Sequence, residues 1–158
     1  MPKIDRKLIA KKANIVSDLK KIIKTENVLH HEDEVRPFET DALSAYKQKP
    51  LIVVFPENTK EVSQILSYCN KNRIKVVPRG AGTGLSGGAL PVADSILLCL
   101  GKFKRIIDID YKNRCVVAQP GVTNLSITQA VQDKDFYYAP DPSSQIACSI
   151  GGNVAENS

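Results

Sequence analysis

The sequence predicts a mixed fold in which a parallel β-α-β unit precedes an antiparallel β-hairpin. Two apolar runs, "LIVVF" at 51–55 and "IKVVP" at 74–78, have the length of buried strands and flank a segment with helical periodicity. A strand, a helix and a strand within about 30 residues form a unit whose strands run parallel. Further on, the strand-like runs "RIIDID" and "RCVVAQP" are joined by the polar turn "YKNR", which favours a hairpin.

The N-terminal third gives weaker signals. Apolar residues recur at helical spacing and predict one helix over about residues 5–24. The segment 25–50 is polar and contains Pro37 and Pro50, so we interpret it as an extended or looped approach. We therefore expect a helical extension at 1–34 and a second unit at 35–158.

The helix of the β-α-β unit has a clear start. Asn58, with Glu61 three residues later, matches a capping box. Four apolar residues then follow at i, i+3, i+4 and i+7 and predict one buried face: Val62, Ile65, Leu66 and Cys69. After it, "SILLCL" at 95–100 is a further apolar strand, and Thr123 caps a short helix across "NLSITQAVQDK".

Composition excludes several classes of protein. The 158 residues suit one domain of ordinary size, and no apolar run is long enough to span a membrane. The net charge of +5 is concentrated near the N-terminus, but no aromatic residues are interleaved there for stacking on nucleic-acid bases. The four cysteines are too widely spaced for a zinc site, and we expect no metal. A reduced, cytoplasmic protein fits this usage, with membrane association only through partner subunits.

The segment "PRGAGTGLSGG" at 78–88 holds five of the nine glycines. It includes a G-x-G-x-x-G at Gly82, Gly84 and Gly87, but a strand rather than a helix follows, so the dinucleotide fingerprint of Rossmann folds is incomplete. A Walker A loop is excluded because G-K-[ST] is absent. Two interpretations remain: a tight structural loop, or a coil whose backbone amides bind phosphate. We favour the second, with hydroxyl groups of Thr83 and Ser86 as further donors.

A second run of small and polar residues lies near the C-terminal end. "PDPSS" at 140–144 and "SIGGNVAENS" at 149–158 combine glycine with hydroxyl and amide side chains. Two such segments, one on either side of a hairpin and a helix, suggest two walls of one elongated ligand site.

Together these two segments resemble the FAD-binding domain of the vanillyl-alcohol oxidase and p-cresol methylhydroxylase superfamily. The resemblance extends from about Val35 to Ser158 and is strongest to the D-2-hydroxyacid dehydrogenase branch, which includes the FAD-binding subunit of bacterial glycolate oxidase. It implies an α+β fold with a small parallel β-α-β subdomain and an incomplete, antiparallel second subdomain. FAD lies between the two subdomains in this family.

The resemblance also implies site residues. The pyrophosphate is expected on the first segment, the flavin on the second, and Gly121 turns the chain near the cofactor. The candidates are Pro78, Arg79, Gly80, Ala81, Gly82, Thr83, Gly84, Leu85, Ser86, Gly87, Gly88, Gly121, Pro140, Asp141, Ser143, Ser144, Ile150, Gly151, Gly152 and Asn153. Some members bind flavin covalently through a histidine in the first loop. Thr83 stands at that place here and His30 and His31 are distant in sequence, so we expect noncovalent FAD.

The implied reaction is hydride transfer from a 2-hydroxy acid to the flavin, giving a 2-oxo acid. Glycolate, D-lactate and D-2-hydroxyglutarate stay open as substrates. Family members continue beyond the motif that contains Ser158, so the general base and any metal ligands are expected outside this chain. We therefore expect a truncated flavin domain that alone binds FAD weakly or not at all. The alternatives are a non-catalytic remnant or split-gene fragment that needs a partner chain, and an NADPH-dependent flavin reductase of the same superfamily.

Overall fold

A four-stranded sheet with the order β1-β2-β4-β3 forms the centre of the first part of the chain. The computed structural model describes residues 3–157. β2 (Ile52–Val54) and β3 (Lys75–Arg79) both pair in parallel with β4 (Ser95–Cys99), which lies between them. The predicted parallel strands are thus confirmed. β1 (Val28–Leu29) pairs antiparallel with β2 and was missed, because two residues are too few to produce a strand pattern.

The central strands are buried on both faces, which explains their continuous apolar runs. Ile52 and Val54 point to one face, where helices α2 and α4 cover them. Val53 and Leu97 point to the other face and pack with Val35. The helices and 3₁₀ turns of this part are α1 (Arg6–Ala10), α2 (Lys12–Ile22), η1 (Thr25–Asn27), α3 (Glu32–Val35), η2 (Arg36–Phe38) and α4 (Thr59–Asn72).

Helix α4 begins at the predicted N-cap, Asn58, but the return bond of the capping box goes to the amide of Glu57 rather than to that of Asn58. The Asn58 side chain accepts a hydrogen bond from the Glu61 amide at 3.0 Å, and the Glu61 carboxylate accepts one from the Glu57 amide at 2.7 Å. Ile65 and Cys69 are buried against the sheet, but Leu66 is 44% exposed. The prediction for Leu66 was wrong because it lies about 100° around the helix from Ile65, beyond the stripe that contacts the strands.

The predicted single helix at 5–24 is two helices, which corrects that expectation. Lys11 separates α1 from α2 with backbone angles of φ −91° and ψ 8°. Its amide donates to the Leu8 carbonyl at 3.0 Å, an i to i−3 bond that tightens the last turn of α1 and ends it. Apolar spacing alone continues across such a break and does not reveal it.

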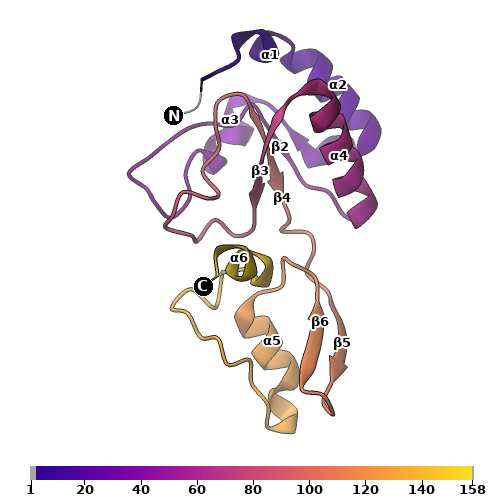
Figure 1. Ribbon diagram of the computed structural model, residues 1–158, viewed down its shortest axis with the longest axis vertical. Coiled ribbons are helices and arrows are strands. Elements are labelled where there is room, and N and C mark those ends of the chain that lie inside the picture. Colours follow the sequence, from indigo (N-terminus) through magenta and orange to yellow (C-terminus); the bar gives the residue numbers. More distant parts are fainter. Residues whose placement is uncertain (1–2, 158) are drawn as a thin grey trace.

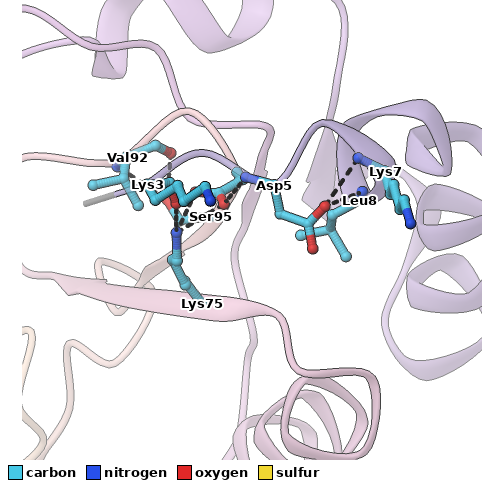
Figure 2. Close-up of polar contacts among 8 residues, drawn as sticks. Lys3, Asp5, Lys7, Leu8, Lys75, Val92 and Ser95 are labelled. Atoms are coloured by element: carbon cyan, nitrogen blue, oxygen red, sulfur yellow. Dashed lines mark hydrogen bonds and ion pairs between the residues drawn. The ribbon is translucent and has the colours of Figure 1, made fainter. Parts of the chain in front are cut away.

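The N-terminal segment is fixed to the sheet by a buried carboxylate (Figure 2). Asp94 is 1% exposed, and both of its oxygens accept hydrogen bonds from Lys75 at the start of β3, at 2.8 and 3.0 Å. One oxygen also accepts from the Asp5 amide at 2.8 Å, and Lys75 donates to the Lys3 carbonyl at 2.9 Å. The Asp5 carboxylate in turn caps the first turn of α1. The basic N-terminal segment is therefore anchored on the protein at residues 3–5.

The second part, residues 101–157, contains the predicted hairpin and two helices (Figure 1). β5 (Ile106–Asp110) and β6 (Cys115–Ala118) pair antiparallel, as predicted. α5 (Asn124–Val131) is capped by the Thr123 hydroxyl, which accepts from the Ser126 amide at 3.2 Å. The helix ends three residues earlier than predicted, in the 3₁₀ turn η3 (Gln132–Lys134).

Helix α6 (Ile150–Glu156) lies between the sheet and the hairpin and was not predicted (Figure 1). Two consecutive glycines give this segment poor helix propensity. Tertiary contacts hold the helix instead, since its first amides, of Ile150 and Gly151, donate to the carbonyls of Val122 and Pro120 at 2.8 and 2.9 Å. Within residues 3–157, none of the helices has the length and apolarity to cross a bilayer.

Candidate functional site

A cleft of about 560 Å³ lies between the two parts of the chain. One wall is the segment that follows β3, and the other is α6 with the residues before it. Loops between β-strands and helices from different layers commonly form such ligand sites. The lining residues are Pro78, Arg79, Gly80, Ala81, Gly82, Thr83, Gly84, Leu85, Gly88, Ala89, Leu100, Pro120, Pro142, Ser144, Ser149, Gly151, Gly152, Asn153, Ala155 and Glu156.

Both predicted segments thus contribute to one cleft, although they are about 60 residues apart in sequence. Of the candidate residues, seven do not line it: Ser86, Gly87, Gly121, Pro140, Asp141, Ser143 and Ile150. Seven lining residues were not among the candidates: Ala89, Leu100, Pro120, Pro142, Ser149, Ala155 and Glu156. Ser149 and Glu156 are the polar ones. A helix over this segment would have placed them with Gly152 on one face through i, i+3 and i+4 spacing, but the helix itself was not predicted.

The glycine-rich loop, residues 80–88, has backbone amides that are free to bind a ligand. Within the described part of the chain, none of the amides from residue 81 to residue 88 donates a hydrogen bond. Gly82 and Gly87 have positive φ angles of 75° and 77°, which turn successive amides in a way that residues with a β-carbon rarely allow. Unpaired amides in such turns form concavities that bind anions, so the loop can hold phosphate groups.

The Arg79 side chain holds this loop in place through hydrogen bonds and a ring contact. Its guanidinium donates to the Thr40 carbonyl at 2.8 Å and to the Ala89 carbonyl at 3.5 Å, and it lies 5.9 Å from the centre of the Phe38 ring. A β-carbon on Gly82 would collide with this guanidinium. The arginine therefore joins both ends of the loop to the 38–40 segment.

Helix α6 lies directly against the glycine-rich loop. The Ser149 hydroxyl occupies the position that a β-carbon on Gly80 would take. The Glu156 carboxylate lies against Gly84 and Gly88, where added β-carbons would be 2.5 and 3.4 Å from Oε1. Gly80 thus allows the approach of α6, a packing role that the number of glycines in the sequence did not reveal.

Asparagine side chains tie the second wall together. Asn153 donates from Nδ2 to Oδ1 of Asn124 at 2.6 Å, and Asn124 donates to the Pro140 carbonyl at 3.2 Å. Asn124 is only 1% exposed, so burial strengthens these bonds and makes their loss costly. The network connects α5, α6 and the segment at 140–144. It therefore fixes the segment 140–144 relative to the segment 149–158.

Backbone packing explains why residue 121 is a glycine. Its amide donates to the Phe103 carbonyl at 2.8 Å. A β-carbon at this position would lie 2.5 Å from the Leu100 carbonyl oxygen and 2.7 Å from that of Phe103. These contacts join the segment after β4 to the start of α5, where the two parts of the chain meet.

None of the histidines or cysteines is among the lining residues, although the Cys148 sulfur accepts a hydrogen bond from Asn153 at 3.7 Å. His30 accepts or shares a hydrogen bond with Lys20 at 3.1 Å, and burial, followed by the charges of His31 and Lys20, lowers its pKa. Burial raises the pKa of Cys69 to about 11 and that of Cys99 to about 12, so both are inert thiols. Residues 3–157 contain no group of three or more His, Cys, Asp or Glu side chains with the geometry of a metal site.

Comparison with known families shows which family of ligand-binding domains contains this cleft. Residues 50–158 match the model of the family described as FAD binding domain. The chain belongs to this family. The match begins at β2 and includes both walls of the cleft. The resemblance inferred from the two glycine-rich segments is therefore confirmed.

Individual relatives and solved structures agree. Glycolate oxidase subunit GlcD of Escherichia coli is 50% identical over 157 residues, which is 99% of this chain and 30% of that protein. A probable mitochondrial D-2-hydroxyglutarate dehydrogenase of Oryza sativa subsp. indica is 37% identical over 90% of this chain and 25% of its own length. The structure of p-cresol methylhydroxylase with substrate bound superimposes with a TM-score of 0.79 at 20% identity, covering 96% of this chain and 30% of that one. The predicted fold class is confirmed, and the chain spans about 30% of the length of these relatives or less.

Proposed function

We propose that this chain is the FAD-binding region of an oxidoreductase that converts a 2-hydroxy acid, of the glycolate or D-lactate type, into the 2-oxo acid. The observation that carries the proposal is the row of unpaired amides at 81–88, in a loop that lines the cleft of a chain belonging to an FAD-binding family. The names of the relatives, a glycolate oxidase subunit and a D-2-hydroxyglutarate dehydrogenase, support the substrate class.

The residues present suit the cofactor. The amides of the glycine-rich loop would hold the pyrophosphate, with the hydroxyl of Thr83, which lines the cleft, as a further donor. From the second wall, Pro142, Ser144 and residues 151–153 would line the flavin side, held by the Asn124 and Asn153 network. When bound, the flavin would accept the hydride that leaves the α-carbon of the 2-hydroxy acid. The part of this chain is to bind the cofactor, orient it and exclude water from it.

Noncovalent binding is the mode we propose. Thr83 lines the cleft and offers a hydroxyl, a group that binds phosphate by hydrogen bonding. His30 and His31 stack on each other with ring centres 4.1 Å apart, and the His30 amide donates to Glu34. Neither histidine is among the lining residues of the cleft.

Polypeptide beyond these residues is proposed to complete the enzyme. The relatives are more than three times as long as the matched region. Large apolar side chains are exposed on the second part of this chain: Ile107, Val117, Tyr137, Ile146 and Val154. We propose these side chains as contacts for a further chain segment or subunit. The general base and the substrate-binding groups would come from that polypeptide, in the cytoplasm or at a membrane reached through partner subunits.

The test is to produce the chain with and without the polypeptide that corresponds to the rest of the relatives. The completed protein is expected to be yellow, to release FAD on acid denaturation, and to lose its flavin absorbance when glycolate or D-lactate is added without oxygen. The chain alone is expected to bind FAD weakly. A completed protein that holds FAD but is bleached by no 2-hydroxy acid contradicts the substrate class, and bleaching by NADPH instead supports the reductase alternative.

A further inference from the structure

Glu156 places a negative charge in the cleft without forming an ion pair with any residue in the range 3–157. Among the lining residues, Arg79 and Glu156 are the charged ones. The guanidinium of Arg79 is bound to two carbonyls and lies over Phe38. Glu156 makes no hydrogen bond or ion pair with residues 3–157. Arg79 keeps its positive charge, but its hydrogen bonds go to the Thr40 and Ala89 carbonyls, so the Glu156 carboxylate is the charged group of the cleft that has no bonded partner within residues 3–157.

This carboxylate lies at the same loop whose amides are unpaired. Its Oε1 lies 2.5 Å from the position of a β-carbon on Gly84 and 3.4 Å from that on Gly88. It contacts the α-carbon side of these residues rather than their amides, because neither amide donates a hydrogen bond to it. The amides stay available for phosphate oxygens, while any phosphate bound to them has the carboxylate as a neighbour.

We propose that Glu156 makes the cleft select ligands by the charge of their phosphates. A pyrophosphate that bridges two groups is favoured, and a terminal phosphate is disfavoured. The proposal deepens the proposed function, because it rests on a dinucleotide as the ligand of this cleft. A terminal phosphate carries a charge of about −1.5 to −2 near neutral pH, whereas a phosphate esterified on both sides carries about −1. The additional charge of a terminal phosphate is repelled by Glu156.

The size of the effect follows from Coulomb's law. One additional negative charge about 6 Å from the carboxylate, in surroundings close to water, weakens binding about threefold. The effect is larger where the cleft excludes water. Because the backbone amides are present for either ligand, they contribute affinity but little discrimination by charge.

The experiment compares ADP, which ends in a terminal phosphate, with ADP-ribose, which has the same adenosine but a bridging pyrophosphate. Both are titrated into the ¹⁵N-labelled chain, and the amide shifts of residues 81–88 report binding. The wild-type chain is expected to bind ADP-ribose more tightly. Glu156→Gln should improve ADP binding more than ADP-ribose binding, so that the ratio of the two dissociation constants falls about threefold.

Asp133→Asn is the matched control, because it removes one negative charge from an exposed position in η3 that does not line the cleft. It should leave the ratio unchanged. An unchanged ratio in Glu156→Gln, or an equal change in Asp133→Asn, overturns the proposal. Amides at 81–88 that do not respond to either ligand also overturn it. Since no flavin reduction is measured, failure of the 2-hydroxyacid assignment would leave this result in place, and the two can be distinguished.

Discussion

The hydroxyl of Ser149 occupies the position that a β-carbon on Gly80 would take, so α6 rests on the glycine-rich loop only because residue 80 has no side chain. This contact joins the two walls of the cleft. Gly80 follows the last residue of β3, and Ser149 is the N-cap of α6. The position of the loop in the first part of the chain thus depends on a helix in the second part.

Gly80→Ala is expected to destabilise the chain by about 1–3 kcal/mol, because the added methyl group displaces Ser149 or the loop. Ser149→Ala in the same chain should restore most of that loss. The Cβ of Ser149 would be 3.4 Å from the new methyl group, a contact that a shift of a few tenths of an ångström relieves. Urea unfolding of the two single variants and the double variant measures the coupling. Additive losses would show that the hydroxyl is not what Gly80 accommodates.

The buried pair of Asp94 and Lys75 predicts a pH-dependent loss of stability. Burial opposes ionisation of Asp94, but hydrogen bonds from Lys75 and the Asp5 amide outweigh it, so the pKa of this carboxyl is lowered. A lowered pKa stabilises the fold above the unfolded value of about 3.9, and this contribution is lost as the pH falls through the folded pKa.

Asp94→Asn should therefore cost about 1–3 kcal/mol at neutral pH, and the difference from wild type should shrink below about pH 4. Chemical denaturation at a series of pH values checks this. The exposed pair of Lys49 and Glu32 provides a control, since Lys49→Met should cost less than about 1 kcal/mol. A cost for Asp94→Asn that does not vary between pH 7 and pH 3 would contradict the role of its charge.

Arg79→Lys is expected to loosen the glycine-rich loop even though it keeps the positive charge. A lysine cannot bind the Thr40 and Ala89 carbonyls together and stack over Phe38, which the guanidinium does here. Amide hydrogen exchange should accelerate at the end of the loop, at Leu90, whose amide donates to the Gly87 carbonyl at 3.2 Å, while strands β2 and β4 keep their protection. Arg105→Lys, outside the cleft, is the control and should leave exchange in the loop unchanged. Unchanged exchange in Arg79→Lys would show that the loop does not depend on this side chain.

Local patterns of the sequence predicted most elements of the fold. Continuous apolar runs identified β2 and β4, which are covered on both faces, and β3, which is an edge strand and only partly buried. The capping residues Asn58 and Thr123 identified the starts of α4 and α5. The position of β4 between β2 and β3 could not be derived, since the order of strands depends on packing between segments distant in sequence.

The two segments that form the cleft could be predicted from the sequence, but the way in which they are assembled could not. Glycine density in two segments was enough to indicate a cleft with two walls. It did not distinguish glycines that free amides for a ligand, such as Gly82 and Gly87 with their positive φ, from those that admit α6, such as Gly80. Helix α6 depends on hydrogen bonds to the carbonyls of Pro120 and Val122, a tertiary contribution that helix propensity does not contain.

Gly121 and Gly101 provide the clearest separation of these roles. The sequence around these two positions gave no strong reason for a glycine at either, and the resemblance placed Gly121 near the cofactor. In the structure a β-carbon on Gly121 would meet backbone carbonyls of Leu100 and Phe103 at 2.5 and 2.7 Å, whereas one on Gly101 would meet nothing within 4 Å. Backbone atoms cannot rotate away as a side chain can. Gly121→Ala should therefore cost roughly 2–4 kcal/mol, and Gly101→Ala less than about 1 kcal/mol.

Thermal and urea unfolding of the two alanine variants measures this difference, and the ADP-ribose titration of each shows whether binding changes apart from folding. If Gly121 acts through packing alone, the fraction of Gly121→Ala that stays folded should bind with the wild-type affinity. Gly121 is not among the residues that line the cleft, which is why we expect this result. A stable Gly121→Ala chain with weakened binding would instead return Gly121 to the cofactor site, as the resemblance implied.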